Sequence, residues 1–144
     1  MLIIALIELM ARELLVLRRN PWGDLMLLRE LSTLQHEKVL YLTTVGHKSG
    51  MPRTIEIWFV IHQRRFYLLA ELGLKAHWVQ NIQVNPRVTL RIKHRRLQAY
   101  GRVLDDVRDR QEWRAVAELS RRKYGWGEGL PVAFEVFQEE KLGR

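Results

Sequence analysis

Hydrophobic and polar positions change their period at about residue 36 of the 144-residue chain. Before that point the apolar residues recur at helical spacing, which predicts a first helix over about 2–18. Asp24 can cap a second helix that runs to about Gln35, and Pro21 with Gly23 separates the two. We therefore expect residues 1–35 to form N-terminal helices that pack on the following domain or on a partner subunit.

Residues 36–144 instead contain strand-length runs rich in β-branched and aromatic residues. In 87–94 the residues Val88, Leu90 and Ile92 alternate with basic residues, which is typical of a strand with one buried face. The predicted strands cover 38–45, 53–61, 64–72, 87–94, 95–104 and 131–137. The connections at 46–52, 62–63 and 94–95 are too short for parallel crossovers, so the pairing should be antiparallel.

Two helices are predicted between these strands. Leu74, Trp78 and Ile82 recur at i, i+4 and i+8, and the pair Asn85-Pro86 stops that helix. Asp105 is predicted to cap a later helix that Gly125 ends. The fold class is therefore mainly β (α+β): a small antiparallel barrel with flanking helices, because closure removes the edges that such a sheet would expose.

Composition excludes several classes of protein. The chain has no cysteine, so disulfides and thiolate chemistry are absent, and none of its five histidines has the spacing of a zinc site. The apolar N-terminal run ends at Glu8, far short of the ~20 residues that cross a bilayer, and no positive charge precedes it. We expect no metal, no membrane span and a cytoplasmic protein.

The basic surplus is concentrated in the middle of the chain. The net charge is +8, but residues 31–104 hold twelve Lys and Arg against only Glu37, Glu56 and Glu71, a balance of +9. Such a field attracts anions: a phosphorylated cofactor, an acidic substrate or nucleic acid.

Two stretches in this basic segment are candidate anion sites. In TVGHKSGMPRTIEIWF (44–59), glycines 46 and 50 can present backbone N–H groups to an anion, while Lys48 and Arg53 add charge. The same residues are equally compatible with a solvent-exposed turn that binds no ligand. In LKAHWVQNIQVNP, Lys75 lies at a predicted helix start, where the N–H groups and the dipole favour an anion. A short amphipathic helix with Trp78 in the core is the plainer interpretation.

Together the runs YLTTVGHKSGMPRTIEIWFV, RFYLLAELGLKAHWVQNIQVNPRVTLRI and YGWGEGLPVAFEVF resemble the flavin-binding split-barrel superfamily over about residues 36–137. This superfamily includes pyridoxamine 5'-phosphate oxidase-like proteins and deazaflavin-dependent nitroreductases. The resemblance implies a six-stranded split barrel that works as a homodimer, with the cofactor between subunits. Its basic cofactor-phosphate ligands correspond to Arg53 and Lys75. The residues that we expect around the cofactor are Lys48, Arg53, Thr54, Ile55, Glu56, Leu69, Ala70, Lys75, Trp78 and Asn81.

The sequence departs from the oxidase proper at Glu56 and lacks its C-terminal Arg/His signature, so vitamin B6 oxidation is not expected. GHKSG and HWVQNIQVNP are closer to the deazaflavin branch, which leaves FMN and a deazaflavin coenzyme open. A bound flavin would itself carry the hydride chemistry. No catalytic residue is identified; His77 is a candidate proton donor, and a surface histidine is the plainer interpretation.

Three functions remain open. The first is a flavin-dependent oxidoreductase that acts on an unidentified small molecule. The second is a protein of the same fold that binds flavin or haem without turnover. The third is a basic nucleic-acid-binding barrel that uses the predicted hairpin tips HQRR (62–65) and KHRR (93–96), although no nucleic-acid reader motif is present. The two candidate anion sites favour the first two functions over nucleic-acid binding.

Overall fold

The computed structural model describes residues 29–141 of a chain that divides into two compact units, Met1–Leu34 and Gln35–Arg144. In the first unit, residues 29–34 are helical. The helix predicted over about 2–18 and the cap predicted at Asp24 lie outside the described residues. In the part of the chain that is described, no helix is both long and apolar enough to cross a membrane.

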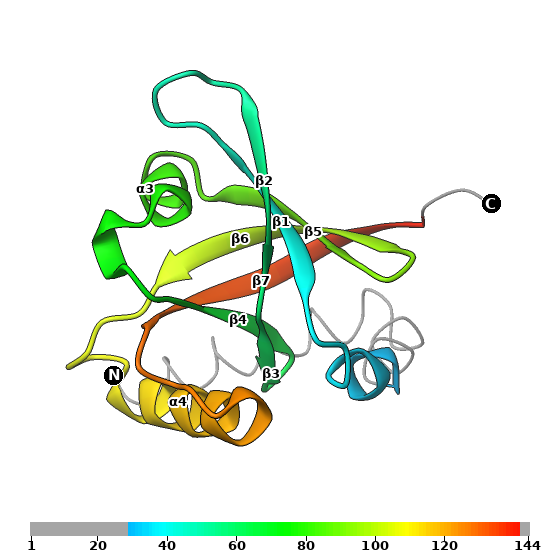
Figure 1. Cartoon of the computed structure of the whole chain (residues 1–144). Coiled ribbons are helices and arrows are strands. Elements are labelled where there is room, and N and C mark those ends of the chain that lie inside the picture. The colour runs from blue at the N-terminus through cyan, green and yellow to red at the C-terminus, as the bar shows by residue number, and fades with distance from the viewer. Residues whose placement is uncertain (1–28, 142–144) are drawn as a thin grey trace, which may run out of the picture. The chain divides into compact units, whose positions relative to one another are not determined.

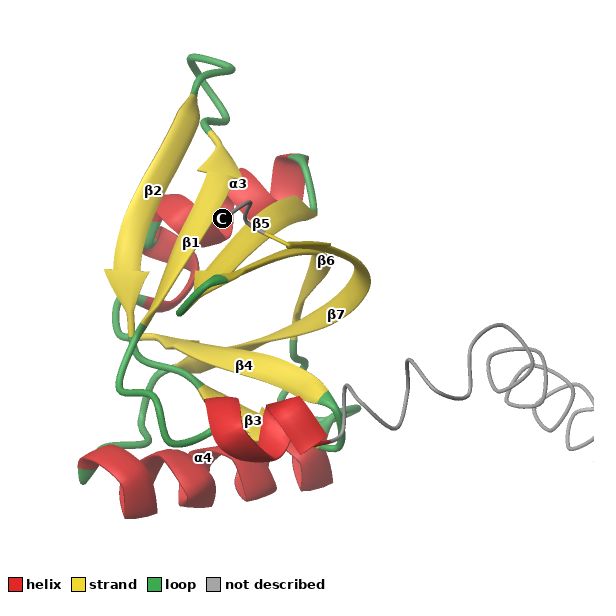
Figure 2. Cartoon of the chain, turned by 90° about the vertical axis from the view of Figure 1, so that its right-hand side faces the viewer, coloured by secondary structure: helices red, strands yellow, loops and turns green. Residues whose placement is uncertain are grey.

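The second unit is built on one antiparallel sheet with the strand order β2-β1-β5-β6-β7-β4-β3 (Figures 1 and 2). The mainly β prediction is confirmed, but the sheet has seven strands rather than six. The strands are β1 (Leu40–Val45), β2 (Pro52–Ile57), β3 (Val60–His62), β4 (Arg65–Ala70), β5 (Arg87–Ile92), β6 (Arg95–Val103) and β7 (Leu130–Lys141). The helices between them are the 3-10 turn η1 (Gly73–Lys75), α3 (His77–Val84) and α4 (Arg110–Tyr124).

The extra strand arises because the run predicted as one strand, 53–61, breaks at Trp58 and Phe59. β2 pairs with β1, whereas β3 pairs with β4. Between them, the Phe59 N–H donates to the Tyr124 hydroxyl at 3.1 Å, and the Phe59 carbonyl accepts from Lys123 Nζ at 3.1 Å. The backbone of Phe59 is therefore bonded to side chains of α4 instead of to a neighbouring strand, and no glycine or proline marks the break.

The described sheet does not close into the expected barrel. Its two edges are β2 and β3, which are consecutive in the chain and separated only by residues 58–59. The sheet therefore has to curl until one end of each edge strand meets the other, which makes a half-barrel (Figure 2). The unpaired edge of β2 is consequently left accessible, and five of its six residues are exposed.

The helices cover different parts of the curled sheet. α3 packs against β1 and β6, and α4 packs against β3 and β7 (Figure 1). α4 is tied to the sheet by the buried Tyr67, whose hydroxyl donates to Glu112 at 2.5 Å. Burial, together with the Glu112 carboxylate, raises the pKa of Tyr67 to about 12. The largest fully buried side chains are Tyr67, Phe59, Phe66, Phe134, Leu40, Leu42, Leu68, Leu90, Ile92, Leu97, Val79 and Val116.

The helix ends predicted at Asn85 and Gly125 are confirmed. Gly125 ends α4 in the left-handed conformation, with φ 76°, and Asn85 ends α3. The prediction for Asp105 is wrong: its carboxylate accepts the N–H groups of Val107 and Arg108, at 2.9 and 2.8 Å, and so caps a preceding turn. α4 begins only at Arg110.

Acidic partners surround one of the two basic hairpin tips. Lys93 lies 3.0 Å from Glu37, Arg95 lies 2.7 Å from Glu139, and Arg96 lies 3.7 Å from Glu140. Two of these acids belong to β7, which extends beyond the predicted strand 131–137. The basic charge of this tip is therefore offset locally, which weakens the case for nucleic-acid binding.

Candidate functional site

The GHKSG stretch forms the tight turn between β1 and β2. The Gly46 N–H donates to the Met51 carbonyl at 2.8 Å, and the Gly50 N–H donates to the Gly46 carbonyl at 2.8 Å. A Cβ on Gly46 would come within 2.6 Å of Ser49 Oγ and 3.2 Å of the Met51 carbonyl oxygen, so a larger residue there would require the Ser49 side chain to move. The expectation that these two glycine N–H groups bind an anion is wrong, because both are used inside the turn.

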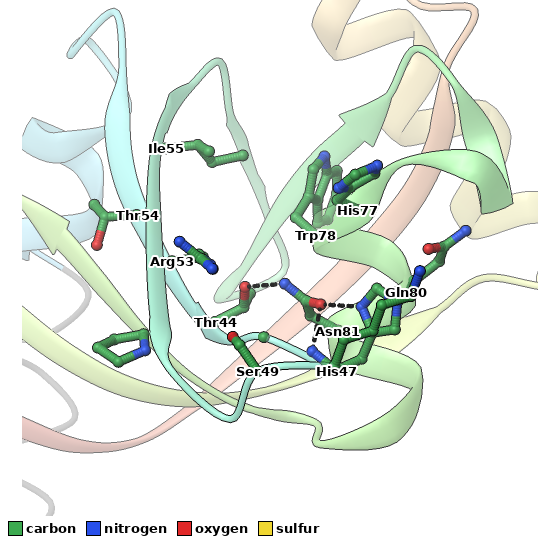
Figure 3. Close-up of a pocket in the computed structure, with 13 residues that line it drawn as sticks. Thr44, His47, Ser49, Arg53, Thr54, Ile55, His77, Trp78, Gln80 and Asn81 are labelled. Carbon is green, nitrogen blue, oxygen red and sulfur yellow. Dashed lines mark hydrogen bonds between the residues drawn. The ribbon is translucent and has the colours of Figure 1, made fainter.

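Asn81 of α3 fixes this turn to the helix. Asn81 is 4% exposed, and its Oδ1 accepts the His47 backbone N–H at 2.9 Å. His47 Nδ1 lies 2.6 Å from the same oxygen, and Asn81 Nδ2 donates to Thr44 Oγ1 at 2.9 Å (Figure 3). Because an amide oxygen only accepts, His47 Nδ1 carries the hydrogen. Asn81 thus positions the turn and has little capacity left for a ligand.

A pocket of about 600 Å³ opens between this turn, β2 and α3. We call it the basic pocket. Its lining residues are Thr44, Gly46, His47, Lys48, Ser49, Pro52, Arg53, Thr54, Ile55, His77, Trp78, Gln80 and Asn81. The set contains Lys48 and Arg53 and no acidic residue, so the pocket suits an anion.

The strand period of β2 aims Arg53 at this pocket. Arg53 and Ile55 lie on the side of β2 that faces His77 and Trp78, whereas the Thr54 side chain lies on the other side (Figure 3). There the Thr54 hydroxyl lies 2.8 Å from the Thr43 hydroxyl. Within residues 29–141, neither Arg53 nor Lys48 makes an ion pair, so both cations are available to a ligand.

A second pocket, of about 640 Å³, continues along the same side of β2. We call it the tryptophan pocket. Its lining residues are Ile57, Trp58, Leu69, Glu71, Leu72, Ala76, His77, Trp78 and Trp126. His77 and Trp78 line both pockets, so the two form adjoining parts of one cleft.

The last turn of α4 supports the tryptophan pocket from behind. Trp58 stacks on Tyr124 with ring centroids 4.4 Å apart and planes 2° apart. Lys123 Nζ lies 3.9 Å from the centre of the Phe59 ring, and burial lowers the pKa of Lys123 to about 8. The stack covers one face of the Trp58 indole and leaves the side chain 41% exposed.

Six of the ten predicted cofactor residues line the basic pocket: Lys48, Arg53, Thr54, Ile55, Trp78 and Asn81. Leu69 lines the tryptophan pocket. Ala70 is buried beside it in β4, and Glu56 lies 3.5 Å from the Tyr41 hydroxyl, on the Thr54 side of β2. Lys75 is exposed at the end of η1 and lines neither pocket. Their role in cofactor binding stays a prediction.

Sequence reasoning missed His47, Glu71, Trp58 and Trp126 as site residues. His47 reaches the site through Asn81, a polar residue on the buried face of a helix, and that position was a usable signal. Trp126 depends on Gly129, where a Cβ would come 2.6 Å from Trp126 Cη2. This contact joins the 125–129 segment to the site, and no spacing rule in the sequence predicts it.

A family model for F420H(2)-dependent quinone reductase matches residues 28–132, which contain all of the lining residues. Solved structures share the fold at low identity. A Listeria innocua protein assigned as a pyridoxamine 5'-phosphate oxidase is 15% identical, with TM-score 0.65, over 83% of this chain and 99% of that one. An F420-H2 dependent reductase is 23% identical, with TM-score 0.53, over 70% and 95%.

A third structure, the heme storage protein HutZ from Vibrio cholerae, is 21% identical, with TM-score 0.59, over 78% of this chain and 88% of that one. These neighbours confirm the split-barrel class that the sequence resembles. Within that class, the chain belongs to the F420H(2)-dependent quinone reductase family.

Proposed function

We propose that this protein is an oxidoreductase that holds the deazaflavin coenzyme F420 in the basic pocket and reduces a small molecule. The observation that carries the proposal is the pair Arg53 and Lys48, two cations without ion-pair partners in the described chain. They face a pocket that lies beside aromatic side chains and inside the region matched by the family.

The residues present suit such a coenzyme. Arg53 has the planar guanidinium that binds a phosphate through two parallel hydrogen bonds, and Lys48 supplies a second positive charge. F420 carries a phosphodiester and a carboxylate-rich tail, whereas FMN carries a single phosphate. A pocket with two free cations and no carboxylate suits the phosphate of either coenzyme, and the family match is what favours F420 over FMN.

When bound, the reduced coenzyme supplies the hydride. The protein's contribution is positional. Ile55 offers an apolar side chain and β2 its backbone along one wall, while Trp78 forms the opposite wall (Figure 3). His77 lies where the two pockets join and is the candidate proton donor. If His77 is the proton donor, the variant His77→Ala should lose activity and keep its affinity for the coenzyme.

We also propose that the protein acts as a homodimer with the coenzyme near the subunit interface. β2 is an edge strand that is exposed on both faces. On β6 and β7, Tyr100 and Phe137 stack on each other at 4.5 Å and remain 49% and 43% exposed. Sedimentation velocity should give a dimer, and the double variant Tyr100→Glu, Phe137→Glu should give a monomer. A monomeric wild-type protein at micromolar concentration would overturn this proposal.

The function is tested by titrating the protein with F420, FMN and haem and following absorbance and fluorescence. We expect F420 to bind most tightly and Arg53→Glu to weaken it by roughly 100-fold or more, because the variant replaces a charge-assisted contact by repulsion. Arg91→Glu is the matched control, since Arg91 lies over the Tyr41 ring and outside both pockets.

Tighter binding of FMN would move the assignment to a flavin enzyme. Tight haem binding with no F420 binding would favour the activity of HutZ instead. Equal losses in Arg53→Glu and Arg91→Glu would mean that only the general field attracts the coenzyme, and the basic pocket would lose its assignment.

A further inference from the structure

Three of the chain's five tryptophans, Trp58, Trp78 and Trp126, line one pocket. Large aromatic side chains at an accessible cavity are costly to leave in water, so a cluster of them indicates a ligand. Trp58 is held by its stack on Tyr124, and Trp78 by its contact with Phe134, with ring centroids 6.5 Å apart. The pocket is therefore already formed in the structure.

The charge of this pocket is opposite to that of its neighbour. Its lining contains the carboxylate Glu71 and no lysine or arginine, whereas the basic pocket contains Lys48 and Arg53 and no carboxylate. Glu71 is one of only three acidic residues within 31–104, a segment with a balance of +9. Within this positively charged segment, a carboxylate beside three indoles makes the pocket favour a positively charged ligand.

Glu71 also differs from the other two acids of that segment in having no partner. Glu37 lies 3.0 Å from Lys93, and Glu56 lies 3.5 Å from the Tyr41 hydroxyl. Across the described chain, Glu71 makes no ion pair and no side-chain hydrogen bond. Its charge is thus available to a ligand in the pocket.

We propose that the tryptophan pocket binds an organic cation, such as a methylated ammonium group. The indole faces attract the cation through their quadrupoles, and Glu71 supplies a formal counter-charge. The apolar rings also favour removal of water from the methyl groups of the cation. A small hydrated ion such as sodium would lose its hydration there without gaining oxygen ligands in return, so it should bind poorly. Binding does not require a coenzyme in the basic pocket, although a ligand held here would lie beside it.

The test compares choline with its uncharged isostere 3,3-dimethylbutan-1-ol, on protein labelled with 5-fluorotryptophan and without added coenzyme. The five fluorine signals are assigned from single Trp→Phe variants. We expect choline to bind roughly 3- to 30-fold more tightly than the isostere. Only the signals of Trp58, Trp78 and Trp126 should shift.

Two variants separate charge from shape. Glu71→Gln keeps the size of the side chain and should lower the affinity for choline while leaving that for the isostere unchanged, because only the formal counter-charge is lost. Glu56→Gln removes an acid of the same segment outside both pockets and should leave the affinity for choline unchanged. Trp58→Leu should weaken both ligands, with an unchanged circular dichroism spectrum as the check on folding.

Equal affinity for choline and the isostere, shifts confined to Trp22 or Trp113, or equal losses in Glu71→Gln and Glu56→Gln would each overturn the proposal. Choline binding without F420 binding would leave this site standing and remove the proposed function. F420 binding without choline binding would do the reverse.

Discussion

The basic pocket and the tryptophan pocket share His77, Trp78 and one side of β2, yet they are built in different ways. The basic pocket depends on a hydrogen-bonded turn that Asn81 fixes to α3. The tryptophan pocket depends on ring stacking against α4. Polar groups that must be fully paired thus define one end of the cleft, and aromatic packing defines the other.

This difference means that each pocket can be altered without the other. Asn81 and the 46–51 turn lie outside the tryptophan pocket, and Tyr124 and Trp126 lie outside the basic pocket. Substitutions in the residues that support the basic pocket should therefore affect F420 binding alone. Substitutions in the residues that support the tryptophan pocket should affect binding of the organic cation alone.

The largest expected effect is a difference in F420 affinity between variants of Arg53 and Lys75, both of which the sequence predicts as ligands of the cofactor phosphate. Arg53→Ala should weaken F420 binding by roughly 10- to 100-fold, since it removes a charged hydrogen-bond donor from the pocket wall. Lys75→Ala should weaken it by less than about threefold, because Lys75 lines neither pocket and acts only through its distant charge. Isothermal titration of both variants measures the difference. A larger loss in Lys75→Ala would move the anion site to the end of η1.

The second prediction concerns the support of the basic pocket. Asn81→Ala leaves Thr44 and the His47 N–H without their partner, so it should lower the free energy of unfolding by about 1–3 kcal/mol. Urea denaturation measures this loss. F420 affinity should fall in the same variant while choline affinity is kept. A parallel loss of choline binding would show that the two pockets are coupled through α3.

The third prediction concerns the support of the tryptophan pocket. Tyr124→Phe keeps the stack on Trp58 but removes the hydroxyl that bonds the Phe59 N–H, which should cost about 0.5–1.5 kcal/mol of stability. Tyr124→Leu also removes the stack and should weaken choline binding. F420 binding should be unchanged in both variants. If Tyr124→Leu lowers F420 affinity as much as choline affinity, the two pockets are not independent.

The smallest expected effect is a pH dependence at Lys123, next to the tryptophan pocket. Burial lowers the pKa of this lysine from its ordinary value of 10.5 to about 8, so the folded state binds the proton less tightly than the unfolded state. Stability contributed at this position should therefore rise as the pH rises from about 8 to about 10.5. Chemical denaturation of wild type and Lys123→Met at pH 7 and 9.5 measures this, with Lys48→Met as an exposed control.

The sequence predicted most of the strands because their signal is local. Alternation in 87–94 identifies β5, and the short connections identify the antiparallel pairing. The break at Trp58-Phe59 was missed because it depends on Tyr124 and Lys123, which lie 65 and 64 residues away in the chain. The predicted closed barrel is wrong for the same reason: an unbroken strand over 53–61 would pair at both edges of the sheet and close it, whereas the break leaves β2 and β3 as two separate edges.

As with the fold, the local features of the site could be predicted from the sequence, but its assembly from distant segments could not. A strand period aims Arg53 and Ile55 to one side of β2, and the sequence carries that information. The tryptophan pocket combines residues from the β2–β3 link, β4, α3 and the segment after α4, so only the tertiary structure assembles it. Glu71 illustrates the limit: it was visible as a rare acid, but its position beside three indoles was not.

The place of β7 in the sheet has a consequence for how the protein is made. β7 is the last strand within residues 29–141, yet it pairs with both β6 and β4. During synthesis, the group β2-β1-β5-β6 and the hairpin β3-β4 therefore leave the ribosome before the strand that joins them. A chain shortened before Leu130 would hold two sheet fragments, each with an open edge, and such edges invite aggregation. The twelve residues of β7 therefore decide whether the earlier strands become one sheet.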